Sequence, residues 1–197
     1  MEKWFPTIYD VAMKPLEQAR LKKVRKELIS KAKGRVLEIG SGTGVNFPYY
    51  HNAYQVDAIE PNFLMVEKSL KRKKQSKVPI QTYLLKAEKL PFSDNTFDSV
   101  VGTLVFCTIS EPLKALREIK RVSKPSANLL FLEHVRMSQP TLGKAQDFLT
   151  PFWKNICDGC HLNRNTLELF EQTHLTIKKV DAYYKGLFLA IECSNNK

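Results

Sequence analysis

The segment LEIGSGTGVN, residues 37–46, places three glycines within five positions directly after an apolar run. Glycine adopts positive φ without steric cost and has no Cβ to keep a ligand away from the peptide plane. Residues 35–39 before this loop read as a short strand, and a helix is expected to begin near Asn46. A buried strand that ends in such a loop indicates a backbone that comes close to a bound molecule. The three glycines are Gly40, Gly42 and Gly44.

Strand-like and helical segments alternate around this loop through the first 135 residues. The expected helices cover 7–32, 62–74 and 112–122. The expected strands cover 35–39, 54–59, 80–85, 97–106 and 128–134, and two further β-rich pieces at 175–183 and 186–193 form an antiparallel pair. On the helix over 62–74, Phe63, Val66 and Leu70 are expected to share one side. The alternation predicts an α/β fold, a Rossmann-like doubly wound sheet of seven mostly parallel strands with an antiparallel last strand and helices on both faces.

Length and composition indicate one globular domain, because 197 residues with 43% hydrophobic and 26% charged side chains suffice for a core. No apolar run approaches the ~18 residues that a transmembrane helix needs. The first residues also lack the layout of a signal peptide. Since the four cysteines read as free thiols, these features predict a cytoplasmic protein.

The net charge of +11 attracts anionic partners, which include nucleic acid, a membrane surface and acidic small molecules. The basic stretches 20–26 and 68–77 read as solvated helix faces. No aromatic side chains interleave with their lysines, as a groove for single-stranded nucleic acid requires. Nucleic acid is therefore not expected as a partner, whereas peripheral contact with a membrane surface stays open.

Cys157 and Cys160 form a C-x-x-C motif that is followed by His161. The motif is typical of a redox pair or of half a zinc site. The sequence offers no second Cys/His pair to complete a tetrahedral site, and nothing thioredoxin-like surrounds it. We therefore expect no metal site.

An acidic residue, Glu60, ends the strand after the glycine loop and lies twenty positions beyond Gly40. This is the separation at which a carboxylate hydrogen-bonds ribose hydroxyls. The loop reads G-x-G-x-G, however, and not the G-x-G-x-x-G that places a pyrophosphate at a helix N-terminus. Glu38 also stands directly before the loop, where a carboxylate suits a cationic ligand. These observations favour a nucleoside that carries an amino acid over a dinucleotide.

Four segments in order carry a family resemblance: VLEIGSGTG, AIEPN, AEKLPFSDNTFDSVVGTLVF and ALREIKRVSKP. Over residues 35–135 the chain resembles the class I S-adenosylmethionine-dependent methyltransferases, and most of all the branch with the ubiquinone and menaquinone enzymes. The later piece EHV…PFWKNICDGCHLNRNT is similar to the methyltransferase-like thiol methyltransferases and their D-G-C-x-L-x-R pattern. The resemblance implies a single methyltransferase domain, with a helical lid over 1–33, a cofactor-binding core over 34–135, and acceptor-side helices with a final hairpin over 136–197.

The resemblance implies a site for the amino-acid end of S-adenosylmethionine at the glycine loop. Backbone groups of Gly40, Ser41 and Gly42 are expected to line the methionine moiety. Glu38 is expected near its ammonium group, to which Thr103 offers a carbonyl.

For the adenosyl end, the resemblance implies that Glu60 binds both ribose hydroxyls and that Met65 packs on the adenine face. Ala87 and Glu88 are expected at the adenine edge. The family often has Asp where this chain has Lys86, so Glu88 is expected to take over the contact with the adenine amino group. The remaining members of the expected site are Gly44, Asn46, Pro61, Asn62 and Tyr9, the last as part of the lid.

Methyl transfer from a sulfonium is an in-line displacement, and the protein contributes mainly by aligning donor and acceptor and excluding water. A base is needed only where the acceptor must lose a proton. The candidates are His134, Asp158 and His161, although a histidine at a strand end is also commonly satisfied by the backbone. Arg164 is either a group that binds an anionic acceptor or a surface cation.

The acceptor is expected to be small and apolar. No D/N-P-P-Y motif follows the strand over 97–106, which argues against the exocyclic amino groups of nucleobases. Four aromatic residues indicate a pocket for a thiol, a quinol or phenol, or a lipid-like molecule, although core packing explains such residues equally well. These residues are Phe106, Phe148, Phe152 and Trp153.

The sequence thus predicts an S-adenosylmethionine-dependent methyltransferase with a small-molecule acceptor. Two alternatives stay open at this point. One is a module that binds S-adenosylmethionine without catalysis, and the other is a nucleic-acid methyltransferase drawn to its substrate by the positive charge.

Overall fold

The computed structural model describes residues 20–197, so Tyr9 and most of the expected lid lie outside the described residues. The core is a seven-stranded sheet in the order β3-β2-β1-β4-β5-β7-β6. Of the seven strands described, β7 alone runs opposite to the other six, which confirms the predicted fold class. The strands are β1 (Lys33–Ile39), β2 (Asn52–Ile59), β3 (Ile80–Tyr83), β4 (Phe97–Thr103), β5 (Ser123–His134), β6 (Thr176–Tyr183) and β7 (Phe188–Ser194).

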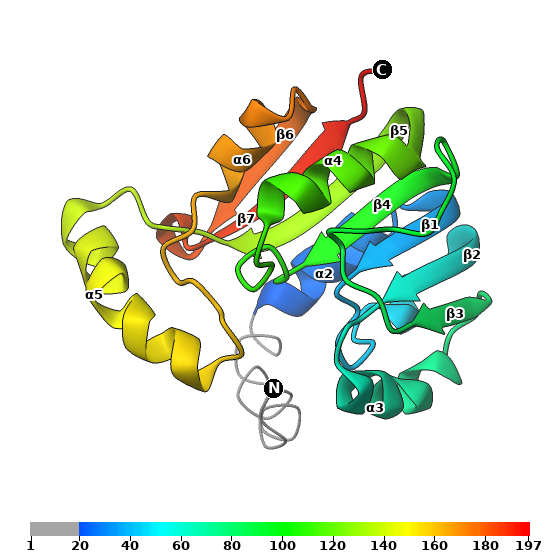
Figure 1. Ribbon diagram of the computed structural model, residues 1–197, viewed down its shortest axis with the longest axis horizontal. Coiled ribbons are helices and arrows are strands. Elements are labelled where there is room, and N and C mark those ends of the chain that lie inside the picture. The colour runs from blue at the N-terminus through cyan, green and yellow to red at the C-terminus, as the bar shows by residue number, and fades with distance from the viewer. Residues whose placement is uncertain (1–19) are drawn as a thin grey trace.

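Helices cover both faces of this sheet (Figure 1). The helices are α2 (Lys22–Ile29), α3 (Phe63–Lys73), α4 (Pro112–Val122), α5 (Pro140–Ile156) and α6 (Thr166–Gln172), with short 3₁₀ turns η2 (Phe47–Tyr49) and η3 (Tyr184–Gly186). α4 and α6 pack on one face and α2 on the other, and each face has its own buried apolar cluster. On β1, Val36 and Leu37 point into opposite clusters, as alternation along a strand requires. Among residues 20–197 no helix has the length and apolar character to cross a membrane.

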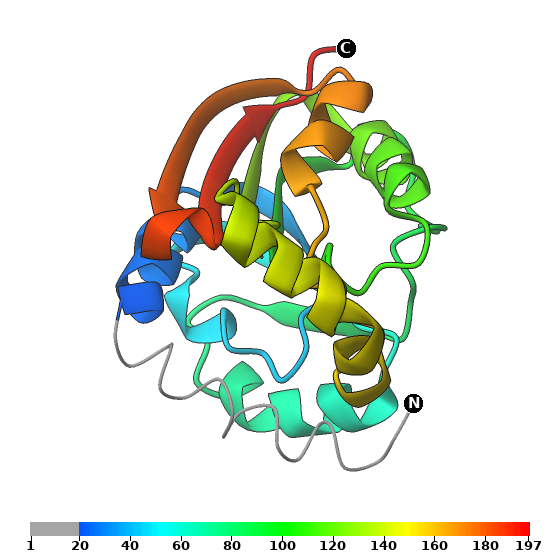
Figure 2. The same cartoon turned by 90° about the vertical axis from the view of Figure 1, so that its left-hand side faces the viewer.

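The strand register brings the ends of three strands to one edge of the sheet. Ile39 of β1 pairs with Ile59 of β2 and with Gly102 of β4. The glycine loop, Glu60 and the segment after β4 therefore leave the sheet side by side. α5 lies beyond this edge, apart from the helices that cover the sheet (Figures 1 and 2).

The helix expected near Asn46 is wrong, because the glycine loop leads only into the 3₁₀ turn η2. The loop closes on itself with hydrogen bonds from Gly44 N to Ser41 O and from Phe47 N to Gly44 O. Pro48 lacks an N–H for further helical bonding, and the buried ring of Phe47 fixes the turn to the core.

The expected apolar side of the helix over 62–74 also differs from the structure. On α3, Phe63 and Leu70 are exposed, whereas Met65 and Ser69 face the protein. Ser69 lies where a Cβ on Gly44 would make contact. The helix therefore packs closely on the glycine loop through a small residue and leaves large apolar groups outside.

Phe106 is a core residue and does not line an acceptor pocket. Its ring is fully buried and makes edge-to-face contacts with Phe131 at 5.4 Å and with Phe170 at 5.3 Å between centroids. Such geometry is favourable for the aromatic quadrupoles. This trio joins the segment after β4 to β5 and α6.

Replacing Phe170 with alanine is expected to lower the free energy of unfolding by about 3–5 kcal/mol, because it opens a cavity within the aromatic trio. Phe148→Ala is the matched control, because this ring is 72% exposed and its loss is expected to change stability by less than about 0.5 kcal/mol. Urea denaturation of both variants makes the comparison. Equal stability of the two would contradict the packing described for α6.

Candidate functional site

A pocket of about 240 Å³ opens at the edge of the sheet where β1, β2 and β4 end. Six residues predicted for the site contribute to its wall, and they are Gly40, Glu60, Pro61, Ala87, Glu88 and Asp158. The sequence did not single out the others, which are Ile39, Ile59, Leu85, Lys86 (noted only as a departure from the family), Val105, Thr108, Ile109 and Ser110. Half of these come from the segment after β4. They could have been predicted, because ligands in such folds bind beside the residues that follow the strand ends.

The glycine loop presents an open backbone to this pocket. Gly40 and Gly42 have φ of +61° and +51°, which L side chains adopt only with strain. A Cβ on Gly40 would lie 2.2 Å from Val105 Cγ2, whereas a Cβ on Gly42 would meet nothing within 4 Å. Ser41 Oγ is buried and has no hydrogen-bond partner among residues 20–197. The loop thus combines an accessible peptide with a polar atom that lacks a partner there.

Glu60 connects the end of β2 to this loop. Its Oε2 accepts a hydrogen bond from Gly42 N at 3.0 Å, and its Oε1 accepts one from Asn62 N at 2.9 Å. Burial raises the pKa of Glu60, although these two N–H groups oppose that shift, and Asp158 adds to it as a like charge. The carboxylate lines the pocket while being oriented from behind by two backbone donors.

Glu38 belongs to a buried polar network and does not line the pocket. Its Oε1 accepts a hydrogen bond from Asn46 Nδ2 and its Oε2 one from Tyr50 Oη, both at 2.8 Å. Arg25 of α2 donates to Asn46 Oδ1 at 2.8 Å and to Thr103 Oγ1 at 2.7 Å. The network therefore ties α2 and the glycine loop to the ends of β1 and β4. Arg25 corrects the prediction that the basic stretch 20–26 is a solvated helix face, because its side chain is buried in this network. The sequence did not identify Tyr50, which belongs to no motif.

The residues predicted for the adenosyl end fall into two groups. Ala87 and Glu88 line the pocket together with Lys86. Asn62 instead caps α3 by accepting a hydrogen bond from Leu64 N at 3.0 Å, and Met65 is buried one turn further on.

The segment after β4 is held by the carboxylate of Glu133, a residue that the sequence did not single out. Glu133 Oε1 accepts the N–H of Val105 at 3.1 Å and Oε2 that of Phe106 at 3.2 Å. Leu104 just before them has φ of +54°, so the chain turns sharply there. Burial raises the pKa of Glu133 to about 7, while the two N–H groups lower it.

The segment after α5 is joined to the segment after β4 by several hydrogen bonds. The backbone N–H of His161 donates to Cys107 O at 2.9 Å. The guanidinium of Arg164 donates to the carbonyls of Phe106 and Ile109. Arg164 is therefore not a freely solvated surface cation, because its guanidinium joins the two segments. Asp158 of the same segment lines the pocket.

His134, predicted as a catalytic residue, contacts a cysteine and not the pocket wall. Its Nε2 lies 3.2 Å from Cys160 Sγ, and Cys107 Sγ lies within 4.8 Å of both atoms. The neighbouring thiol of Cys107, helped by His134, lowers the pKa of Cys160 to about 5 against the effect of burial. Cys160 therefore clusters with Cys107 and His134, and Cys157 of its C-x-x-C motif does not belong to this cluster.

His161 is also engaged by its surroundings. Its Nδ1 lies 3.2 Å from Cys107 O and 3.2 Å from a guanidinium nitrogen of Arg164. Burial, followed by the charge of Arg164, lowers the pKa of His161. Of the three predicted catalytic residues, Asp158 alone lines the pocket.

The other aromatic residues predicted for an acceptor pocket lie on the surface. Phe148, Phe152 and Trp153 are exposed on α5, and none of them lines the pocket at the sheet edge. The prediction failed because helical aromatic residues were read as facing inward, whereas the inward face of α5 carries Gly143 and Gln146.

Known proteins that are similar to this chain are methyltransferases. A family profile described as "Methyltransferase domain" matches residues 37–131. The chain is 38% identical over 149 residues to thiol S-methyltransferase TMT1B of Rattus norvegicus, and this match covers 72% of the chain and 59% of the rat protein. It is 30% identical over 187 residues to TMT1B of Homo sapiens, with 88% of the chain and 75% of the human protein covered.

A solved structure of a SAM-dependent methyltransferase from Aquifex aeolicus has the same fold. It superposes with a TM-score of 0.64 at 23% identity, and the match covers 91% of this chain and 92% of that one. The chain thus shares its fold with this protein over nearly its whole length, whereas it spans about 59% of the length of the rat relative.

The buried carboxyl of Glu38 makes stability depend on pH. Burial raises its pKa from 4.5 to about 7, although hydrogen bonds from Tyr50 and Asn46 oppose the shift. The stabilising contribution of the protonated Glu38 carboxyl to folding is therefore fully present below pH 4.5 and is lost as the pH rises through about 7. Between about pH 5 and pH 8 the wild-type protein is expected to lose on the order of 2–3 kcal/mol of unfolding free energy relative to Glu38→Gln.

Denaturant unfolding at both pH values measures this difference. Glu27→Gln on the exposed side of α2 is the control and is expected to follow the wild type at each pH. A constant difference between wild type and Glu38→Gln would show that the Glu38 carboxyl does not titrate in this range.

Proposed function

Because the chain belongs to the class I S-adenosylmethionine-dependent methyltransferases, we propose that its pocket binds S-adenosylmethionine and that it methylates a small thiol. The observation that carries this proposal is the carboxylate of Glu60, which lines the pocket and accepts a hydrogen bond from Gly42 N of the glycine loop at 3.0 Å. The names of the TMT1B relatives support a thiol as the acceptor.

The residues present fit this cofactor. Gly42 has no atom within 4 Å on the side where a Cβ would stand, which leaves room for a ligand at the loop. Ser41 Oγ needs a hydrogen-bond partner that residues 20–197 do not supply. Glu60 suits two ribose hydroxyls, because an ionised carboxylate accepts several hydrogen bonds. Ala87 and Glu88 form the wall expected to meet the base.

The buried network around Glu38 has a supporting role in this proposal. Its two carboxylate oxygens are occupied by Asn46 and Tyr50, so it acts by keeping the end of β1 and the loop in place. Thr103 is part of the same network through its hydroxyl, and its carbonyl remains the group proposed to meet the ammonium.

When bound, S-adenosylmethionine supplies a methyl group activated by the adjacent sulfonium. The protein's own contribution is to hold the acceptor in line and to exclude water, an effect that reaches about 7–11 kcal/mol in well-oriented systems. A thiol has a pKa of about 8.5, so it must lose a proton to become a strong nucleophile at neutral pH. Asp158 lines the pocket and is proposed to accept a hydrogen bond from the acceptor S–H and so orient it.

Glu60→Gln is expected to weaken binding of S-adenosylmethionine by roughly 10–100-fold, because charge-assisted hydrogen bonds of about 1.5–3 kcal/mol are lost. Isothermal titration calorimetry with S-adenosylmethionine and with S-adenosylhomocysteine measures both affinities. Glu171→Gln, on the exposed side of α6, is expected to bind both ligands like the wild type. Wild-type affinity in Glu60→Gln would remove the proposed ribose contact.

Release of S-adenosylhomocysteine in the presence of small thiols, phenols, quinols and lipids tests the reaction. The proposal expects turnover with thiols and little with the other classes. Binding of S-adenosylmethionine without turnover of any of these acceptors would instead favour a cofactor-binding module.

We further propose that α5 is the face on which this protein contacts an anionic membrane surface. The buried side of α5 is polar or small: Gln146 donates to the carbonyls of Val135 and Leu162, and Thr150 donates to Gln146 O. The apolar side points outward and is made of Leu142, Phe148, Leu149, Phe152, Trp153 and Ile156. A helix with an exposed apolar face and basic flanks suits the interface of a bilayer.

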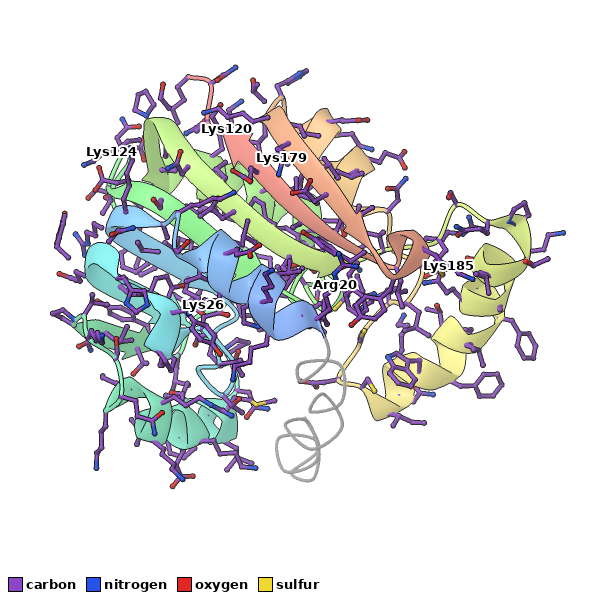
Figure 3. All side chains as sticks on the ribbon, turned by 180° about the vertical axis from the view of Figure 1, so that it is seen from behind. Arg20, Lys26, Lys120, Lys124, Lys179 and Lys185 are labelled. Carbon is purple, nitrogen blue, oxygen red and sulfur yellow. The ribbon has the colours of Figure 1, made fainter. Side chains whose placement is uncertain are left out.

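Charge supports a lipid surface as the partner of α5. The exposed lysines Lys144 and Lys154 lie on the helix itself. Figure 3 shows Lys185 at the turn between β6 and β7, on the side of α5. Each basic residue near an anionic surface contributes about 1 kcal/mol of attraction.

The double substitution Phe148→Ser and Phe152→Ser is expected to reduce co-sedimentation with phosphatidylserine-containing vesicles by at least about tenfold, because two large apolar groups no longer enter the interface. Phe63→Ser is the matched control, since Phe63 is 62% exposed on α3 and Phe152 is 64% exposed on α5. Vesicles of phosphatidylcholine alone are expected to bind less well. Equal binding by all variants, or a dimer that dissociates when the α5 residues are changed, would exclude this role.

A further inference from the structure

Two cysteines and one histidine from three separate segments meet beside the pocket. Cys107 follows β4, His134 is the last residue of β5, and Cys160 belongs to the segment after α5. Their candidate ligand atoms all lie within 4.8 Å of one another. Cys107 and Cys160 are buried, and His134 is partly buried.

The spacing of these atoms is close to that of a zinc coordination sphere. With Zn–S of about 2.3 Å and Zn–N of about 2.0 Å, two ligands of a tetrahedral ion lie roughly 3.5–3.8 Å apart. His134 Nε2 and Cys160 Sγ are 3.2 Å apart, and Cys107 Sγ lies within 4.8 Å of both atoms. Shifts of about 1 Å or less therefore bring the three atoms to the separations of a tetrahedral zinc site.

The backbone around the three side chains is fixed by contacts that need no ion. The N–H of Phe106, just before Cys107, donates to the Glu133 carboxylate. The carbonyl of Cys107 itself accepts the N–H of His161 at 2.9 Å. Cys160 N donates to Cys157 O at 2.9 Å, which closes a tight turn. Such prior organisation is what a metal site requires of its supporting residues.

The surroundings also suit bound thiolates. The guanidinium of Arg164 donates to the carbonyls of Phe106 and Ile109, which lie on either side of Cys107 in the sequence. A nearby cation stabilises negative charge on sulfur. Glu133, beside His134, is already committed to two backbone donors.

We propose that Cys107, His134 and Cys160 bind one Zn²⁺ ion whose fourth coordination position takes the acceptor thiol. Two thiolates and an imidazole suit zinc among the common metals. Three protein ligands with one open position characterise catalytic sites, whereas structural sites use four. The role of the fourth position rests on the proposed thiol methyltransferase function, while binding of the ion does not.

The cluster is well placed to serve the pocket. Thr108, next to Cys107, and Asp158, two residues before Cys160, both line the pocket wall. When a thiol replaces the water on the ion, its S–H proton passes to solvent and its sulfur remains bound as the thiolate. Zinc thus lowers the pKa of the bound group and supplies the proton loss that neither His134 nor His161 is placed to provide from the pocket wall.

The sequence predicted no metal site because only a pair of ligands close in sequence was sought. Cys157, the other cysteine of the C-x-x-C motif, does not belong to the cluster. It lies half-buried three positions from Cys160, so Cys157→Ser is a control matched in both chemistry and place.

Metal content by inductively coupled plasma mass spectrometry is the first test, on full-length protein purified with Zn²⁺ and then dialysed. About one zinc per chain is expected in the wild type and in Cys157→Ser, as for a three-ligand site. At least about a tenfold loss is expected in Cys160→Ser and in His134→Ala. All four proteins are expected to bind S-adenosylhomocysteine equally by calorimetry, which shows that the variants fold.

Cobalt substitution is the second test. Co²⁺ in the wild type is expected to give sulfur-to-cobalt charge-transfer absorption that Cys160→Ser lacks, and added 2-mercaptoethanol is expected to change the visible bands. Absence of metal in every preparation, equal loss in Cys157→Ser, or a Cys107–Cys160 disulfide in unreduced protein would overturn the site. If cobalt binds but its visible spectrum does not change when 2-mercaptoethanol is added, the proposed open coordination position is wrong, whereas the metal site itself stands. Metal binding without methylation of any thiol would count against the proposed function and leave the site intact.

Discussion

The structure depends above all on the carboxylate of Glu133, which receives two consecutive backbone N–H groups from the segment after β4. These donors occur where the chain has left the sheet through a residue with positive φ, so no strand partner satisfies them. Buried N–H groups without partners cost more than a typical hydrogen bond contributes. The same segment supplies Val105 and Ile109 to the pocket wall and the aromatic ring that joins β5 to α6. One buried acid thus determines the shape of the pocket and the packing of the second half of the fold.

The two halves of the site are built by different physical means. On the cofactor side, the glycine positions carry no side chains and the strand ends supply carboxylates. The backbone therefore forms part of the surface that faces the cofactor. On the opposite side, long side chains from a later segment reach carbonyls of an earlier one, as His161 and Arg164 do. The first arrangement is encoded within 25 residues of sequence, since residues 37–60 contain it. The second joins residues that are more than 50 positions apart.

This difference explains how far the sequence could be used for prediction. The alternation of strands and helices, the antiparallel last strand and α4 followed from apolar periodicity and breakers, because these signals are local. Glu60 was identified because it ends the strand after the glycine loop, twenty positions beyond Gly40, the separation expected of a carboxylate that binds ribose hydroxyls. The roles of Glu133 and Arg25 were not predicted, because a buried charged residue is recognised only from the groups that hydrogen-bond to it in the structure. The outward aromatic face of α5 was misread because periodicity gives a helix two sides without saying which one meets the protein.

Arg164 has a consequence for how this protein can change over evolution or in the laboratory. Its guanidinium spans two carbonyls of the segment after β4, so the acceptor-side segment is fitted to one particular loop shape. Exchanging residues 157–164 alone with those of another methyltransferase would leave those carbonyls without donors. A functional chimera has to transplant both segments together, so new acceptor preferences are reached more readily by joint replacement than by single steps.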